Sequence, residues 1–167
     1  NAPNGIDETL DGIVDRVLPD IVRFPSLQKI VVAGHAAGGE LSQPWALLPN
    51  SQAFANPSKQ YVPRAPTRTV VANPKSFCWL DARRYVNGTL RIPDDDDIDD
   101  CPWYNEWEWG LGEGDYLKAP CKDNAIELAG GTEEVVRRYP ARDIVYIAGE
   151  MDVLPNGECM ATMQGQY

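Results

Sequence analysis

The stretch VVAGHAAGG, residues 31–39, decides the fold predicted for this chain. A β-branched run enters a turn of glycine and alanine, and the residues that follow suit a helix. This order is typical of the nucleophile elbow G-x-S-x-G, in which a serine stands at the tip of a sharp strand-to-helix turn. Here Ala36 stands where the serine would be. The alternative is a glycine-rich turn of another α/β protein, but the stretch lacks both G-x-G-x-x-G spacing and a phosphate-binding lysine.

The small residues around this turn have a steric reason. The tip of such a turn is held in a strained backbone conformation, and its neighbours must let strand and helix approach closely. This need is met by Gly34, Ala37, Gly38 and Gly39. The single histidine, His35, precedes the tip, so we expect its side chain to point away from the reacting face. Its expected role is packing or a backbone hydrogen bond.

Helical and strand patterns alternate outward from the turn. The expected strands span 28–33, 68–72 and 143–148, and the expected helices span 7–23, 40–48 and 123–139. Pro19 is expected to kink or end the first helix near its last turn, and Pro44 to lie in the first turn of the second or to bend it. The alternation predicts an α/β fold with a parallel sheet in a three-layer αβα arrangement. Residues 75–122 lack a clear period and form a long excursion within a single domain, 1–167.

Composition excludes several classes of partner. The chain has 167 residues, a formal net charge of −10 and 43% apolar residues, which suits one globular domain. An acidic surface repels phosphate backbones, so nucleic acid is not an expected partner. No apolar run reaches the roughly 20 residues that a membrane-spanning helix needs. The chain begins at Asn1 rather than methionine, and three strands make a thin sheet, so we expect an internal portion of a larger fold.

Four cysteines and one sequon favour an oxidising compartment. The cysteines are Cys78, Cys101, Cys121 and Cys159; with no C-x-x-C pair and one histidine in the chain, they predict no zinc site. Their even number predicts two disulfides with all four cysteines oxidised. Cys101 could pair with Cys121 or with Cys159, and the sequence does not choose. Asn87 begins the N-glycosylation sequence Asn-Gly-Thr, so the protein is expected to be secreted.

A carboxylate follows the third expected strand. In a triad of nucleophile, acid and histidine, the acid follows a later strand in chain order. The stretch DIVYIAGEMDV supplies a strand, a glycine turn and then Asp152, with Glu150 as the local competitor. A carboxylate there would orient the histidine of a triad and stabilise its imidazolium form. The alternative for Asp152 is a solvated loop residue or a helix cap.

At this point the chain resembles the α/β-hydrolase-fold family, especially its secreted fungal-type serine esterase and lipase-like members. The stretch GHAAGGELSQPWALL is similar to the GHSAGG elbow and following helix of that family. The stretches VVANPKSFCWLDARR, CPWYNEWEWGL, RRYPARDIVYIAGEMD and ECMATMQGQ then follow in the family's order. The resemblance spans residues 10–165 and implies a partial α/β-hydrolase fold.

The resemblance implies roles for three residues. It gives the nucleophile position to Ala36, one oxyanion N–H to Ala37 and the acid position to Asp152. It also implies that the first strands with the second oxyanion donor, and a catalytic histidine beyond Tyr167, belong to parts of the fold outside this chain. A methyl group has neither a lone pair nor a proton for nucleophilic catalysis. Loss of triad members costs on the order of 10⁶-fold in rate in related chemistry, so the chain as given is expected to be catalytically inactive.

Three hypotheses about function stay open at this stage. The chain is a catalytically inactive α/β-hydrolase-like protein, a fragment or Ser-to-Ala variant of an active secreted serine esterase or lipase-like hydrolase, or a non-catalytic binding or structural module. The expected partner is a small ester, lipid or carbohydrate ligand, or the missing remainder of its own fold. No cofactor and no metal ion are expected.

Two other features have plain interpretations. The run DDDDIDD at 94–100 carries carboxylates that could hold calcium, but it lacks the alternating ligands of an EF-hand loop and is expected to be solvated. An aromatic cluster could line a sugar or lipid site, or it could pin the long excursion onto the core. Its members are Trp103, Tyr104, Trp107 and Trp109.

Overall fold

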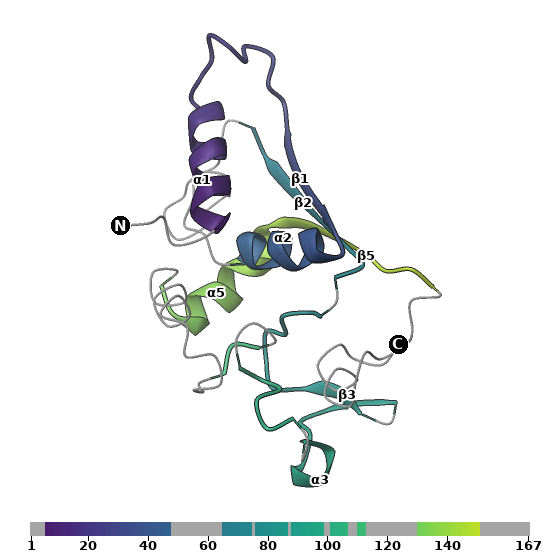
Figure 1. Cartoon of the computed structure of the whole chain (residues 1–167). Helices are drawn as coiled ribbons and strands as arrows, with labels where there is room; N and C mark the ends of the chain where they lie inside the picture. Colours follow the sequence, from purple (N-terminus) through teal and green to yellow (C-terminus); the bar gives the residue numbers. More distant parts are fainter. Residues whose placement is uncertain are drawn as a thin grey trace.

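A parallel sheet of three strands forms the centre of the molecule. The computed structural model describes residues 6–47, 65–74, 76–86, 88–98, 101–106, 110–112 and 130–150. The strands are β1 (Ile30–His35), β2 (Thr67–Ala72) and β5 (Asp143–Ile147), in the order β1-β2-β5 (Figure 1). The register sets His35 beside Ala72 and Ala72 beside Ile147, so all three strands end at one edge. The predicted α/β class, with neighbouring parallel strands, is confirmed.

The helices differ from their predicted bounds. They are α1 (Ile6–Val17), α2 (Ala37–Leu47) and α5 (Thr132–Arg138), which the 3₁₀ turn η2 (Tyr139–Ala141) follows. The predicted end of α1 at residue 23 is wrong, whereas the alternative that the helix ends at Pro19 agrees with its last residue, Val17. Proline disfavours a helical residue directly before it. α2 begins at Ala37 rather than at residue 40, and Pro44 lies in its interior. Residues 130–139 of the third predicted helix, 123–139, fall within the described residues, and α5 begins only at Thr132.

Helices α1 and α2 cover one face of the sheet. Val14 and Leu18 are four residues apart on the same side of the α1 segment, and they pack with Trp45 of α2. Ile30 and Val32, alternate residues of β1, lie against this cluster. The buried residues of β2 alternate in the same way and face the same side of the sheet.

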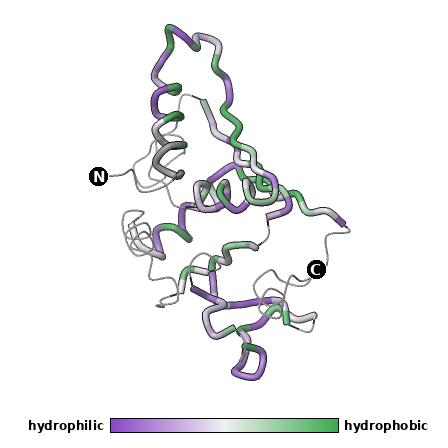
Figure 2. Tube along the Cα trace, in the orientation of Figure 1, coloured by the Kyte–Doolittle hydropathy of each residue, from purple (hydrophilic) through white to green (hydrophobic). Residues whose placement is uncertain are grey.

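The opposite face of the sheet is open in the described part of the chain. Val31 of β1 is 56% exposed and Ile147 of β5 is 51% exposed. By register and alternation, both side chains lie on the face away from α2. Figure 2 shows the hydrophobic colour that runs along β1. The described residues therefore supply the sheet and one helical layer.

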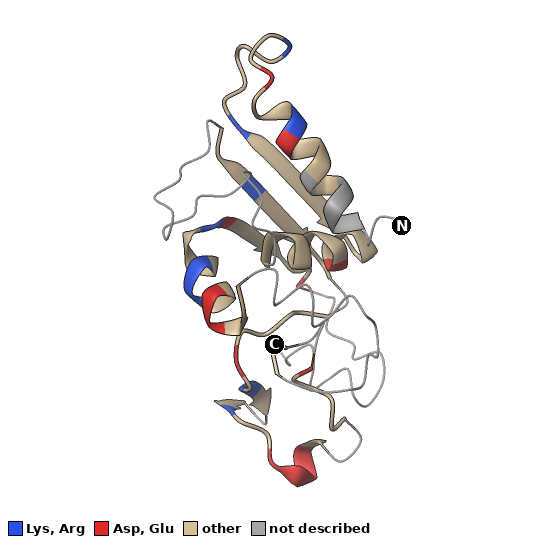
Figure 3. Ribbon diagram, turned by 90° about the vertical axis from the view of Figure 1, so that its left-hand side faces the viewer, with Lys and Arg blue, Asp and Glu red and all other residues tan. Residues whose placement is uncertain are grey.

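The excursion between β2 and α5 contains a small hairpin. Strands β3 (Arg84–Val86) and β4 (Thr89–Arg91) are antiparallel, and Gly88 between them has a φ of 77°, which a tight hairpin turn favours. The short helix α3 (Asp95–Ile98) follows and carries a cluster of acidic residues at the far end of the molecule (Figure 3). The described part of the excursion thus contains a hairpin and a short helix.

Candidate functional site

The turn between β1 and α2 is a tight strand-to-helix elbow. β1 ends at His35 and α2 begins at Ala37, so Ala36 alone connects them. Its φ is 53°, in the left-handed region that a residue with a Cβ enters at a cost of roughly 1–2 kcal/mol. The Ala36 N–H donates to the Ala72 carbonyl at 3.0 Å, and the Ala36 carbonyl accepts from the Glu40 N–H at 3.1 Å. The predicted strained tip is confirmed.

Two glycines allow β1 and α2 to come together at this elbow. A Cβ at Gly34 would lie 1.8 Å from the carbonyl oxygen of Gly38. A Cβ at Gly39 would lie 2.9 Å from the carbonyl oxygen of Ala72. A Cβ at Gly38 would meet nothing within 4 Å, and Ala37 is exposed. The sequence suggests that four small residues are needed for the close approach of strand and helix. In the structure, only Gly34 and Gly39 of these four lack room for a Cβ.

The chain after β5 reaches the same edge of the sheet. Asn73, directly after β2, donates its N–H to the Ile147 carbonyl at 2.8 Å. Its side-chain Oδ1 accepts the Gly149 N–H at 2.7 Å. Glu150 follows in an exposed turn. Asp152, the predicted acid, lies outside the described residues, so its position relative to the elbow tip stays a prediction.

His35 lies on the open side of the sheet. It is the exposed last residue of β1 and alternates with the residues that pack under the helices. In a strand, successive side chains point to opposite faces. His35 therefore shares the side of Val31, whereas Ile30 and Val32 face α1 and α2.

The cysteines differ from the predicted arrangement. Cys78 is a half-buried thiol that packs against the apolar cluster between α2 and α5, so the prediction of two disulfides is wrong at this position. A cysteine can serve as a small apolar core residue, which is the role of Cys78 here. Cys101 is 2% exposed and takes part in a disulfide. Cys121, Cys159 and the glycosylation residue Asn87 lie outside the described residues.

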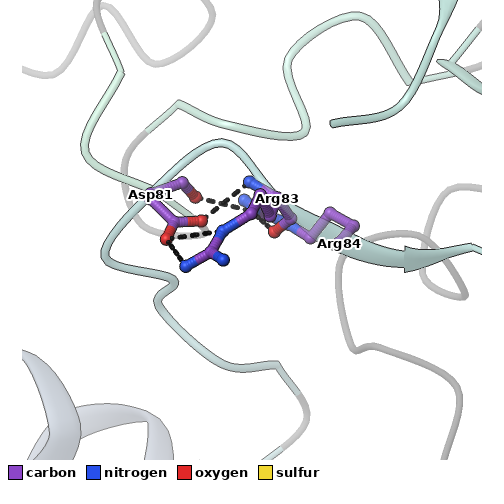
Figure 4. Close-up of polar contacts among 3 residues, drawn as sticks. All are labelled: Asp81, Arg83 and Arg84. Carbon is purple, nitrogen blue, oxygen red and sulfur yellow. Dashed lines mark hydrogen bonds and ion pairs between the residues drawn. The ribbon is translucent and has the colours of Figure 1, made fainter. Parts of the chain in front are cut away.

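The aromatic cluster contributes to a structural clamp around Arg84. This side chain is fully buried, and its guanidinium lies 5.0 Å from the ring centres of both Trp79 and Tyr104. It donates to the carbonyl oxygens of Asp81 at 2.8 Å, Arg83 at 2.7 Å and Tyr104 at 2.8 Å (Figure 4 shows the first two partners). Two stacked rings and three carbonyl acceptors tie β3 to the segment after Cys101. Trp107 and Trp109 lie outside the described residues.

The pKa values of two groups around this clamp are lowered, for different reasons. Burial lowers the pKa of Arg84 to about 10, so the side chain stays charged at neutral pH. A hydrogen bond from Arg83 lowers the pKa of the exposed Asp81 carboxyl. Sequence reasoning missed the clamp. Its only signal is an Arg-Arg pair that enters a β-branched stretch in an acidic chain.

Two carboxylates in the described part of the acidic run are engaged by their own segment. The Asp94 and Asp97 carboxylates each accept the backbone N–H of the other residue, at 3.2 Å and 2.9 Å, and so cap α3. The Arg91 guanidinium lies 3.3 Å from Asp94 and 2.6 Å from Asp97. The described residues contain no group of three or more His, Cys, Asp or Glu that could hold a metal ion. Capping and an ion pair thus account for these carboxylates.

A pair of tyrosines joins β5 to η2. The Tyr139 and Tyr146 hydroxyls lie 2.5 Å apart, and the Phe77 ring lies 5.7 Å from that of Tyr146. Burial raises the pKa of both phenols. Gln43 of α2 donates to the Cys78 carbonyl at 3.2 Å in the same region. These neutral phenols hold elements together and are not poised for proton transfer at neutral pH.

None of the helices in the described part of the chain has the length and apolar character to cross a membrane. Neither a protein-family model, nor a curated protein, nor a solved structure matches the chain. What can be inferred about function therefore rests on the elbow, its contacts and the sequence pattern around it.

Proposed function

We propose that the β1–α2 turn is a nucleophile elbow of the α/β-hydrolase type, and that the chain is a catalytically inactive protein of that lineage because Ala36 occupies the nucleophile position. The observation that carries the proposal is the left-handed φ of 53° at this single connecting residue. The close approach at Gly34 and Gly39 adds a second feature of such an elbow. The tip also lies at the carboxyl edge of a parallel sheet, where open α/β folds bind their ligands.

The chemistry of the tip supports an inactive protein. The Ala36 methyl offers no attacking atom, and the one histidine of the sequence, His35, points to the face away from α2. Ala37 opens α2, and the N–H groups of a helix's first turn lack intrahelical acceptors. An oxyanion role for the Ala37 N–H follows from this position. The turn thus keeps a place for a nucleophile and one donor, without the atoms that would break an ester.

Two alternatives remain within the same proposal. The first is a Ser-to-Ala variant or a portion of an active secreted serine esterase or lipase-like enzyme, which the order of the matching sequence segments supports. The second is a binding or structural module, favoured by the open sheet face with Val31 and Ile147 more than half exposed. Parallel sheets are normally covered on both faces. In the binding or structural module, the remainder of its own fold would cover the open sheet face. An ester, lipid or carbohydrate ligand would bind at the carboxyl edge of the sheet.

The elbow geometry can be tested with a thiol at the tip. In Ala36→Cys the new thiol stands at the N-terminus of α2, where the helix dipole favours the thiolate. We expect alkylation by iodoacetamide at pH 7 to be about 2- to 5-fold faster than in Ala33→Cys. Ala33 is an exposed residue of β1 and serves as the matched control. Mass spectrometry separates both sites from Cys78, and equal rates at the two positions would contradict the proposed elbow.

A fluorophosphonate probe tests the absence of catalysis. The unmodified chain is expected to resist labelling, and Ala36→Ser in this chain should restore little because no histidine faces the tip. The same change in a full-length parent that contains a later histidine and an early oxyanion loop should restore labelling. Labelling of the unmodified chain at any serine would overturn the inactive reading. Absence of labelling in the full-length serine variant would favour the binding module.

A further inference from the structure

The residue after the central strand lies between the elbow and the turn after β5. β2 pairs with β1 on one side and with β5 on the other, and the three strands end in register. The Ala72 carbonyl accepts the Ala36 N–H at 3.0 Å, which fixes the elbow tip to the end of β2. The next residue, Asn73, bonds the Ile147 carbonyl with its N–H and the Gly149 N–H with its Oδ1, both toward β5. Ala72 and Asn73 together therefore bond the elbow on one side and, on the other, the end of β5 and the chain after it.

The backbone of Asn73 is bent for this role. Its φ is 40°, so it is the second non-glycine residue after Ala36 with a left-handed conformation among the described residues. Asparagine tolerates this region better than most residues because its short polar side chain bonds locally. The bend lets the N–H bond the Ile147 carbonyl at 2.8 Å while Oδ1 reaches the Gly149 N–H at 2.7 Å. The left-handed backbone of Asn73 thus occurs together with a side-chain acceptor for the Gly149 N–H.

The elbow also constrains the other side of this bend. The Cβ that Gly39 lacks would lie 2.9 Å from the Ala72 carbonyl oxygen and 3.4 Å from the Cα of Pro74. The first turn of α2 therefore rests on the residues that flank Asn73, and Pro74 is itself buried. A shift of Asn73 cannot leave the elbow unaffected, because both of its neighbours contact the elbow.

We propose that Asn73 is a positioning residue, which holds Gly149 and the carboxylate-bearing residue Glu150 in a fixed place relative to the elbow tip. The inference rests on the proposed function, since it gives the elbow and the expected acid segment one shared anchor. Glu150, the first carboxylate of that segment, follows the anchored amide directly. Asn73 touches no reacting atom and acts through the Gly149 N–H and the Ala72–Pro74 backbone.

Three variants at Asn73 separate the side-chain bond from the backbone bend. Asn73→Gly keeps the left-handed conformation accessible and removes the acceptor. Asn73→Asp keeps an acceptor of the same shape, and Asn73→Ala removes the acceptor and adds strain. Hydrogen exchange measured by NMR on the folded, full chain should show the Gly149 amide exchanging about 2- to 12-fold faster in Asn73→Gly, and unchanged or slower in Asn73→Asp. The amide resonances of Ala36 and Glu40 should move in Asn73→Gly and return in Asn73→Asp.

The outcomes distinguish this inference from the proposed function. Unchanged Gly149 exchange in Asn73→Gly would overturn the positioning role, whatever the reactivity of the Ala36→Cys thiol. Faster exchange at Gly149 with no change at the Ala36 amide would also overturn it, because the two segments would then be independent. A slow Ala36→Cys thiol together with the expected Asn73 results would instead overturn the nucleophile-elbow proposal and leave the shared anchor intact.

Discussion

Alanine substitutions at three glycines of the elbow, Gly34, Gly38 and Gly39, are expected to change the free energy of unfolding in opposite directions. In Gly34→Ala the added methyl would lie 1.8 Å from the Gly38 carbonyl oxygen and 2.2 Å from its carbon, both backbone atoms that no rotamer change can move. In Gly39→Ala it would lie 2.9 Å from the Ala72 carbonyl oxygen. In Gly38→Ala it would project into open space on the helix surface.

The size of each effect follows from these distances. Overpacking costs typically 1–3 kcal/mol and occasionally more, so Gly39→Ala should lose about 1–3 kcal/mol of unfolding free energy. Gly34→Ala should lose about 3 kcal/mol or more, because α2 must move away from β1. Gly38→Ala should gain about 0.5–1 kcal/mol, since alanine is the better helix former.

Urea unfolding monitored by circular dichroism measures all three variants. The slope of free energy against urea should stay constant, so that midpoint shifts report stability alone. Gly38→Ala also controls for any general intolerance of alanine at this turn. A Gly34→Ala variant as stable as the unmodified chain would refute the close approach of β1 and α2. If Gly38→Ala lost as much free energy of unfolding as Gly39→Ala, the conclusion that Gly39 lacks room for a methyl group and Gly38 does not would be refuted.

Three further predictions concern the sheet, the clamp and acid unfolding. Val71→Thr should lose about 1–3 kcal/mol because the hydroxyl enters the fully buried face, whereas Val31→Thr on the open face should change stability by less than about 0.5 kcal/mol, both measured by urea unfolding. Arg84→Lys should lose about 2–4 kcal/mol and alter the near-ultraviolet circular dichroism, because an ammonium cannot stack between two rings while bonding three carbonyls. A hydrogen bond from Arg68 lowers the pKa of Asp143, so the pair stabilises the fold above the unfolded aspartate pKa of about 3.9 and ceases to do so as pH falls through the folded value. Arg68→Met should therefore be less stable than the unmodified chain at pH 7 and should converge with it in acid.

The sheet was predictable because its strands are short β-branched runs. The runs IVVA and TRTVVA are short and rich in β-branched residues, so they predict buried strands rather than helices. The structure confirms both strands. The start of α2 was not predictable in the same way. Gly38 and Gly39 are poor helix formers, so a sequence pattern delays the helix to residue 40. The contact of Gly39 with Ala72, 33 residues along the chain, is what places the helix start at Ala37.

The site was predictable at its tip and not around it. A residue between glycines and alanines after a strand suggests a strained turn, and Ala36 has that conformation. Asn73 was visible only as an Asn-Pro dipeptide that ends a strand, because its partner Gly149 lies 76 residues away. Arg84 had no pattern of its own, since a buried arginine depends on rings and carbonyls that the fold alone brings together. The even number of cysteines was misleading because Cys78 packs as an apolar residue.

If the proposed function is right, the elbow is a case in which a reactive geometry persists without its reactive atom. The bend at Ala36 costs roughly 1–2 kcal/mol in an alanine. What maintains the bend is backbone: two hydrogen bonds of Ala36 and the close contacts of Gly34 and Gly39. None of these involves the side chain at the tip, so exchange of a serine for an alanine leaves every one of them in place. Under the proposed function, loss of the nucleophile would therefore remove the chemistry and almost none of the stability, so that the fold could carry an inactive elbow.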